Sequence, residues 1–252
     1  MSNGSVNRQS VELLSVADLA NIRDGYAKMQ GIADNRGYNY LAGIHGVPQF
    51  QCPHHKVLFL PWHRAYLYNV EQFLRDQNAA AALPWWDWTS AQSHASGIPK
   101  AFADKTDPAG KPNPLLKSHM SQPSSRPPLN RDTRRKPAAP SGLSTTADVD
   151  DALSRSDFTD FWMKVEDMHD QVHGWVGGDM GIIPTAAFDP IFFSHHCMID
   201  RLWYLWQIKY GQNNIPSSLL GQHLTPFNNL TVADVLDISH LGYEYAVHTG
   251  TP

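Results

Sequence analysis

Two groups of histidines stand out in the sequence, one of them ending in a strongly apolar stretch, and no other feature of the sequence constrains the fold as much. One group comprises His45, His54 and His63, and the other comprises His169, His173 and the pair His195–His196. Imidazole is a preferred ligand of copper, zinc, iron and nickel, and three imidazoles on one ion leave a coordination position open. A metal ion also supplies the polar partner that a histidine in an apolar segment needs. Two such groups in 252 residues predict a dinuclear centre that binds a small molecule between two ions.

The composition is that of a globular protein. A length of 252 residues predicts one domain over residues 1–252. The formal charge of −4 provides no basic excess for phosphates, so we expect no nucleic-acid partner. No signal-like N-terminus and no run of about 18 apolar residues is present, which predicts a cytoplasmic protein with no membrane partner. A secreted form with a trimmed signal stays open. Two cysteines cannot build a disulfide framework.

The spacing of apolar residues predicts four main helices. They are expected over residues 11–30, 57–76, 157–173 and 190–210. Pro61 falls in the first turn of the second helix or kinks it, Asp189 and Pro190 start the fourth helix, and Gly211 ends it. We therefore expect a mainly α fold with long irregular loops and little β structure. Its core would be a four-helix bundle, because bundles build metal sites from facing helices.

Residues 97–150 differ in composition from the rest of the chain. This segment contains nine of the 18 prolines, and nine Lys or Arg against five Asp. So many prolines exclude long helices, and we interpret the segment as a proline-rich surface insertion that joins two helix pairs. A solvated irregular insertion is the favoured interpretation. A flap near the metal centre or a docking surface is the alternative.

The histidines belong to longer motifs that resemble those of a known family. The segment Cys52–Arg64, CPHHKVLFLPWHR, together with His45, resembles the copper A signature of the tyrosinase and catechol oxidase (polyphenol oxidase) family. The segment His169–Gly181 and the segment Asp189–Trp203, DPIFFSHHCMIDRLW, resemble its copper B signature. Leu241–Tyr245 is similar to the tyrosine motif that closes the catalytic domain. The resemblance covers about residues 8–245. It implies the short form of the family, without the C-terminal domain that plugs the site in many members.

The resemblance implies two copper ions and a set of ligands for each. Copper A would be bound by His45, His54 and His63, and copper B by His169, His173 and His196. His55 is the alternative to His54, which is preferred because nine residues separate it from His63, as in the family. His195 would lie beside the ligands without binding copper. Asp200 and its neighbour Arg201 are expected to form a buried charge pair or to orient ligands.

Cys52 stands two residues before His54. In fungal and molluscan relatives such a Cys-x-His pair forms a thioether cross-link between the sulfur and an imidazole carbon. The resemblance therefore implies a covalently fixed ligand here. A small buried thiol is the alternative.

The reaction implied is oxidation of o-diphenols to o-quinones, with a phenolic small molecule and O2 as partners. Relatives use a water held by a Glu and an Asn to deprotonate a phenol. In this chain the Asn position is Asp170, and Glu166 one turn earlier is the nearest candidate for the other group. Asp170 acts as the base, or its charge misplaces the water. Hydroxylation of monophenols is therefore left open.

Access to the metal centre depends on small residues. Ile183 stands where plant catechol oxidases carry a Phe that shields copper A, and Ile182 and Gly174 add little bulk. This pattern predicts an open pocket for substituted rings, although these residues could simply shape a loop. o-Aminophenol oxidation is the first alternative function. Oxygen transport, as in hemocyanins, is the remote one.

Overall fold

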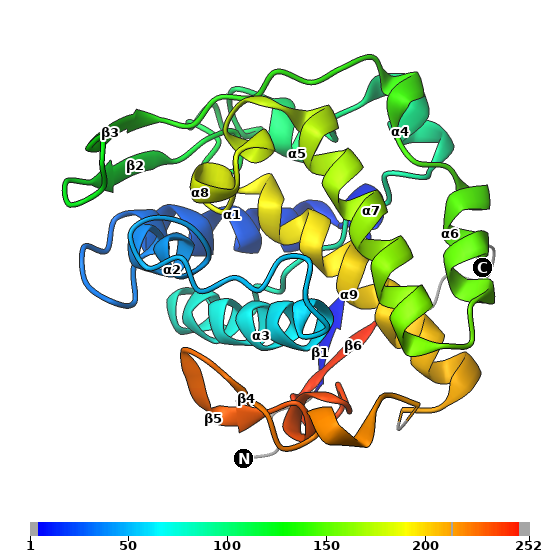
Figure 1. Cartoon of the computed structure of the whole chain (residues 1–252). Helices are drawn as coiled ribbons and strands as arrows, with labels where there is room; N and C mark the ends of the chain where they lie inside the picture. Colours follow the sequence, from blue (N-terminus) through cyan, green and yellow to red (C-terminus); the bar gives the residue numbers. More distant parts are fainter. Residues whose placement is uncertain (1–4, 213, 247–252) are drawn as a thin grey trace.

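Four long helices form the centre of the molecule (Figure 1). They are α1 (Val16–Gln30), α3 (Phe59–Gln77), α7 (Phe158–Val176) and α9 (Ile191–Tyr210). In the computed structural model, which describes residues 5–212 and 214–246, α3 packs against α1, α7 and α9, and α7 also packs against α9. The mainly α fold with a helical core and little β structure is confirmed. The terminal residues of the predicted domain, 1–4 and 247–252, lie outside the described residues, as does residue 213.

The boundaries of these helices follow local chemistry, with two corrections. The helix expected from Val11 is interrupted: Val11–Leu13 form a 3₁₀ turn, and α1 begins after Ser15, whose hydroxyl accepts the N–H of the third helical residue. The fourth helix begins at Ile191, and Pro190 precedes it. Pro61 lies in the first turn of α3, where backbone N–H groups have no intrahelical acceptor.

A fifth helix, α2 (Tyr38–His45), was not predicted, and it carries His45 at its last position. The following residue, Gly46, lets this end approach α8 (Ile183–Ala186) closely, because a Cβ atom there would lie 2.1 Å from the carbonyl oxygen of Pro184. The N–H of Val47 donates to the same carbonyl at 3.0 Å. His45 and the turn at Ile183 are thereby held together.

The other elements are short. The helices are α4 (Ala91–Ser96), α5 (Lys100–Ala103) and α6 (Thr146–Ser154). Among the described residues, β1 (Val6–Arg8) pairs with β6 (Tyr243–Tyr245) in parallel. β2 (His119–Gln122) pairs with β3 (Leu129–Asp132), and β4 (His223–Leu224) with β5 (Phe227–Thr231), in antiparallel fashion. No helix in the described ranges is both long enough and apolar enough to cross a membrane.

The first and last strands are joined to the bundle by buried charges. Arg8 on β1 donates to both carboxylate oxygens of Glu71 on α3 and to Asp200 on α9. Asp200 also accepts from Arg64 and from the hydroxyls of the two β6 tyrosines. Asp200 therefore pairs with Arg8 and Arg64, and the expected partner Arg201 instead lies over the Trp85 ring at 4.1 Å. A buried carboxylate with so many donors stays ionised, since charge-assisted hydrogen bonds offset its desolvation.

The proline-rich segment is fixed to the bundle at several points. Its side chains Phe102, Leu115, Met120 and Leu143 belong to the hydrophobic core. Arg135 forms a buried ion pair with Asp189 at the start of α9. The segment also passes so close to Gly178 that a Cβ atom there would lie 2.1 Å from the carbonyl oxygen of Arg134. Residues 97–150 thus contain more core side chains than a solvated insertion would.

Candidate dinuclear metal centre

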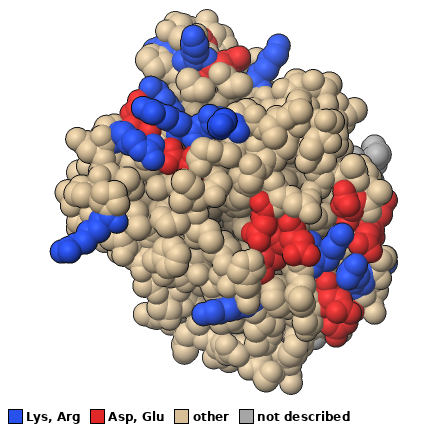
Figure 2. All heavy atoms as spheres, turned by 45° about the horizontal axis from the view of Figure 1, so that its top comes forward, with Lys and Arg blue, Asp and Glu red and all other residues tan. Residues whose placement is uncertain are grey.

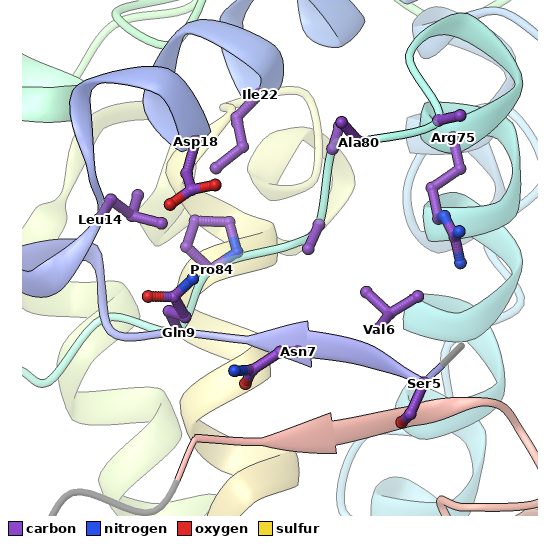
Figure 3. A pocket seen from close by; sticks show the side chains of 13 residues that line it. Ser5, Val6, Asn7, Gln9, Leu14, Asp18, Ile22, Arg75, Ala80 and Pro84 are labelled. Atoms are coloured by element: carbon purple, nitrogen blue, oxygen red, sulfur yellow. The ribbon is translucent and has the colours of Figure 1, made fainter. Parts of the chain in front are cut away.

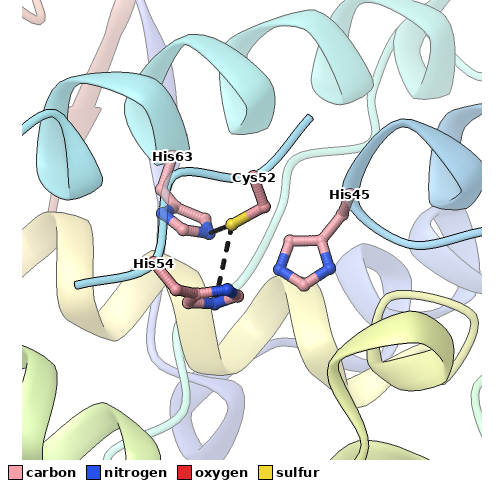
Figure 4. Close-up of side chains that lie close together, drawn as sticks. All are labelled: His45, Cys52, His54 and His63. Carbon is pink, nitrogen blue, oxygen red and sulfur yellow. Dashed lines mark hydrogen bonds between the residues drawn. The ribbon is translucent and has the colours of Figure 1, made fainter. Parts of the chain in front are cut away.

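Four side chains from three different elements form the first cluster (Figure 4). His45 comes from the end of α2, His63 from α3, and Cys52 and His54 from the loop between these helices. One donor atom from each lies within 4.8 Å of all the others. The Cys52 sulfur is 3.5 Å from Nε2 of His54 and 3.4 Å from Nε2 of His63. His55 points elsewhere, with a side chain that is 72% exposed.

The second cluster is carried entirely by two long helices. His169 and His173 are one turn apart on α7, and His195 and His196 are on α9. Nε2 of His196 lies 3.3 Å from Nε2 of His169 and 3.2 Å from Nε2 of His173. Three nitrogens at this spacing suit one ion with metal–nitrogen bonds of about 2.0–2.1 Å. The His195 ring instead stacks on His169, with 5.3 Å between ring centroids.

The two clusters are in direct contact. The rings of His63 and His196 are stacked with centroids 4.4 Å apart, and those of His54 and His169 are 5.6 Å apart. Aromatic rings enclose this junction: Phe59 packs on His63 and His169, and Phe192 packs on His45 and His196. Two ions held by these clusters would therefore share one apolar compartment.

Hydrogen bonds at Nδ1 direct three imidazoles into the compartment. Nδ1 of His63 lies 2.8 Å from the Phe59 carbonyl oxygen, and Nδ1 of His173 lies 2.7 Å from that of Met180. Nδ1 of His169 lies 2.9 Å from the Asp170 carboxylate. Each acceptor requires the proton on Nδ1, which leaves Nε2 as the free lone pair. These partners therefore set the tautomer that a metal requires.

Burial keeps the imidazoles neutral. Desolvation, followed by repulsion from neighbouring histidines, lowers the pKa of His45, His63, His169 and His196 well below the ordinary value. Burial lowers the pKa of His54 and of His173 to about 4. Neutral imidazole is the form that binds metal ions, so both clusters are competent ligand sets at neutral pH.

Buried nitrogens without partners show that the clusters fit a metal. Neither ring nitrogen of His45 has a hydrogen-bond partner in the described part of the chain. The Ile183 backbone near this ring opposes part of the fall in its pKa. A buried polar atom without a partner costs about 1–3 kcal/mol, and a metal ion would remove that cost at His45. His195 also has two ring nitrogens without a hydrogen-bond partner, and one of them lies within 4.8 Å of a ligand atom of His169, His173 and His196.

The loop that carries His54 is bounded by two residues with left-handed backbone, Phe50 (φ 50°) and His55 (φ 55°). This conformation is uncommon for residues with a Cβ atom, so neighbouring contacts must hold it. Glu166 on α7 supplies one of them, accepting the N–H of His55 at 2.7 Å. Burial raises the pKa of Glu166 to about 7, against the opposing effect of that hydrogen bond and of the His55 ring. Glu166 is therefore placed behind the loop.

A cavity of about 230 Å³ leads from the surface to both clusters. Histidines of each cluster line it, together with His55, Asp170, Gly174, Met180, Gly181, Ile183 and Ala186. The Asp170 side chain is 47% exposed, and Ile183 is 39% exposed, so the mouth faces solvent. Of the residues predicted to control access, Gly174 and Ile183 line the cavity, whereas Ile182 (53% exposed) and the predicted catalytic residue Glu166 are not in its wall.

Another cavity, of about 270 Å³, lies between β1, α1 and residues 79–84 (Figure 3). Its polar lining includes Asn7, Gln9, Asp18 and Arg75, and it contains no histidine or cysteine of either cluster. The candidate functional site is therefore the cavity at the histidines.

Comparison with known proteins shows the family. The common central domain of tyrosinase matches residues 35–209 of the chain. This chain belongs to the tyrosinase family. The resemblance predicted from the histidine motifs is thereby confirmed.

Relatives of this tyrosinase-family chain include hemocyanins. Hemocyanin 1 of Megathura crenulata is 28% identical over 96% of this chain and 8% of its own length. The G-type hemocyanin of Enteroctopus dofleini, units Oda to Odg, is 30% identical over 92% of this chain and 9% of its own length. The chain thus spans less than a tenth of these two relatives.

Solved structures share the fold. A functional unit of octopus hemocyanin superposes with a TM-score of 0.82 at 28% identity, covering 96% of this chain and 68% of that one. A tyrosinase from Burkholderia thailandensis gives a TM-score of 0.83 at 22% identity, covering 99% and 75%. The family therefore includes both oxidases and oxygen carriers, and the fold by itself does not separate them.

Sequence reasoning missed several residues that shape the centre. Phe59 and Phe192 enclose it, and the Met180 carbonyl orients His173, yet none of these was predicted to act there. The helix that carries His45 could have been found, since Tyr38–His45 is an apolar stretch between Gly37 and Gly46. A backbone carbonyl as an orienting group leaves no signal in the sequence.

Proposed function

We propose that this protein is a type-3 copper oxidase that uses O2 to oxidise o-diphenols to o-quinones. The observation that carries the proposal is the solvent-facing cavity lined by histidines of both clusters. Its volume of about 230 Å³ lies below the roughly 300–1,000 Å³ of pockets for drug-sized ligands, so it suits one small ring. The apolar wall of Met180, Ile183 and Ala186 suits an aromatic ring.

Six histidines would hold two copper ions as cofactors. We assign His45, His54 and His63 to one ion and His169, His173 and His196 to the other. When bound, copper supplies the redox chemistry between O2 and the diphenol. His195 stays outside the ligand set and packs on His169. We further propose that Cys52 is cross-linked to His54, which its position 3.5 Å from that ring supports.

The polypeptide orients the histidine ligands, keeps water away from the junction between the clusters and accepts protons from the substrate. The Nδ1 partners of His63, His169 and His173 fix these ligands, and the Phe59 and Phe192 rings keep water out of the junction. A diphenol must lose its hydroxyl protons as it is oxidised.

Asp170 is the final acceptor that we assign to these protons, which would reach it through water, because its carboxylate lies in the cavity wall at the solvent-facing end and is half exposed. Hydroxylation of monophenols would depend on the same carboxylate. Glu166 acts through the loop: by holding the His55 N–H it positions His54. We therefore treat Glu166 as a positioning residue.

Absorption spectroscopy tests the coupled centre. Protein loaded with two coppers should develop an intense near-ultraviolet band when hydrogen peroxide is added, because such a band requires both ions to share one ligand. A preparation shown to contain two coppers, yet lacking the band, would contradict a coupled centre and leave two independent metal sites.

Turnover tests the reaction. The copper-loaded protein should consume O2 with catechol and form the o-quinone, and it should do so faster than with tyrosine. Preferred turnover of o-aminophenol would instead support the aminophenol oxidase, whose substrate differs only by an amine.

An oxygen carrier is the second candidate, favoured by the hemocyanin relatives. A carrier should bind O2 reversibly and leave all three phenols unchanged. The open mouth at Asp170 and Ile183 argues against it, since a carrier gains nothing from admitting a ring.

A further inference from the structure

The mouth of the histidine cavity carries negative charge that no fixed cation balances. Asp170 is the single carboxylate in the wall, and no Lys or Arg lines the cavity within the part of the chain that the structure describes. Asp167 lies three residues before it, so these two exposed carboxyl groups share one face of α7. Figure 2 shows acidic side chains gathered beside a hollow near the centre of the face in view, with smaller basic groups next to them on the side away from the hollow and a larger basic group apart at the upper left.

Within the described residues, the Asp170 carboxylate forms no ion pair with a Lys or Arg. Its contacts are His169, whose Nδ1 lies 2.9 Å away, and His55. The nearest lysine on the same helix, Lys164, is paired with Asp151 on α6 at 3.2 Å. The His55 Nε2 atom lies 4.0 Å from the Asp170 carboxylate.

None of the basic side chains of the proline-rich segment lines the cavity. Arg131 is paired with Asp179, and Arg135 with Asp189. Arg134 and Lys136 are exposed, but neither lines the cavity. The basic side chains of this segment therefore do not neutralise the cavity mouth, and the electrostatic potential there is set by the carboxylates of α7.

The ring substituent of a bound substrate would lie close to this negative charge. The histidines form the deep end of the cavity, whereas Asp170 and His55 lie at its exposed end. A catechol whose two hydroxyls approach the histidines therefore carries its C4 substituent toward the mouth. At that end a positive group is attracted and a carboxylate is repelled.

We propose that this site prefers catechols with a positively charged C4 substituent, such as an aminoethyl group, and discriminates against those with a carboxylate. The inference rests on the proposed oxidase function. It names Asp167 and Asp170 as the specificity-determining residues. Asp167 acts through the field at the mouth, because it is exposed and lies outside the cavity wall.

The test compares three catechols that differ only at C4, carrying aminoethyl, ethyl or carboxyethyl groups. At low salt the copper-loaded protein should show kcat/KM in the order cation, neutral, anion, with about fivefold to tenfold between cation and anion. The ratio should approach one in about 1 M salt, where the Debye length is about 3 Å. Equal kcat/KM for the three at low salt would overturn the proposal.

Variants of α7 test which carboxylate causes the preference for a positively charged substituent. Asp167→Asn should lower the cation-to-anion ratio, and Asp167→Lys should reverse it, while turnover of the neutral ethyl catechol stays unchanged. Asp160→Asn is the matched control: it removes an exposed carboxylate from the same helix, about 15 Å along the axis from Asp170, and should leave the ratio intact. An unchanged ratio in Asp167→Lys would contradict the assignment.

Binding without O2 separates this inference from the oxidase proposal. The dissociation constants of the three catechols for the protein loaded with cuprous ions, which cannot oxidise them without O2, should follow the same order under anaerobic conditions. If the ethyl catechol is not oxidised in air, the proposed function fails, whereas the charge preference is still decided by these constants. If the ethyl catechol is oxidised but the anaerobic constants are equal, the charge preference fails and the oxidase stands.

Discussion

The two histidine clusters are built in different ways, although their imidazole rings are in direct contact. The second cluster takes every ligand from the regular helices α7 and α9, and helical periodicity alone brings His169 and His173 together. The first cluster takes its ligands from two helices and a loop, and His54 lies on that loop between two left-handed residues.

This difference shows where each cluster obtains its rigidity. In the second cluster, main-chain hydrogen bonds of two long buried helices hold the ligands. In the first cluster, His54 depends on individual contacts: the Cys52 sulfur beside its ring and Glu166 behind the next residue. We therefore expect the first cluster to be the more sensitive to changes in its surroundings, and both to be equally sensitive to loss of a ligand.

Loss of a ligand should have the largest effect. His196→Ala and His54→Ala should each lower the bound copper from two ions toward one and reduce kcat/KM for catechol more than a hundredfold, beyond the effect of losing an orienting partner. Metal analysis and oxygen consumption measure this. His240→Ala, which removes an exposed histidine far from both clusters, is the control. A His196→Ala protein that still binds two coppers would exclude His196 as a ligand.

Removal of copper should make the protein sensitive to acid. The pKa of His54 and of His173 in the folded apoprotein is about 4, against an ordinary value of 6.5. Between these values the unfolded chain binds protons that the folded apoprotein does not, so the free energy of unfolding falls as pH falls from 6.5 to 4. Each imidazole contributes on the order of 3 kcal/mol to this fall.

Glu166 should act in the opposite direction. Its folded pKa of about 7 lies above the ordinary value of 4.5, so the folded state binds a proton that the unfolded state lacks within that interval. As pH falls from 7 to 4.5, protonation of Glu166 therefore raises the free energy of unfolding, whereas protonation of the histidines lowers it. Urea unfolding of the apoprotein at several pH values should show a steeper loss of stability in Glu166→Gln than in the wild type. Equal slopes would contradict the assigned pKa.

Loss of Cys52 should weaken the first cluster selectively. Cys52→Ala should reduce copper affinity at the first cluster by about 10- to 100-fold, the range for losing a group that orients a ligand, and leave the second cluster unchanged. Copper titration measures both sites. If the cross-link forms, the intact mass of the copper-loaded wild type is lower by two hydrogens. Cys197→Ala removes the other cysteine, which is buried in the core, and should retain both coppers.

Substitutions of Asp170 should give the smallest effect and separate its charge from its hydrogen bond. Asp170→Asn keeps an oxygen that can accept Nδ1–H of His169, so copper content should not change. We expect kcat/KM for catechol to fall less than about tenfold, because solvent at the open mouth can take the hydroxyl protons in place of the carboxylate. Asp170→Ala removes the acceptor and should also weaken copper binding at the second cluster. Equal copper loss in both variants would show that the carboxylate charge, not the hydrogen bond, holds His169.

The sequence was a good guide wherever regular periodicity carries the ligands. The expected helices match α3, α7 and α9 within a few residues, because their apolar spacing is clear and their ends are marked by Asp157 and Gly211. It was a poor guide to α2, which is short and was not recognised between its flanking glycines. The 3₁₀ turn before α1 was missed because the apolar stripe continues through Ser15.

By itself, the sequence determined the family, the helical core and two groups of histidines, since these depend on motifs and on helical period. Tertiary structure alone decided what surrounds them. It placed His63 against His196, and it set Glu166 behind the loop and Asp170 in the cavity wall. It also joined Asp200 to Arg8, 192 residues earlier in the chain, and not to its neighbour. The physical reason is that such contacts depend on how distant segments pack, and a spacing rule describes only neighbours along one element.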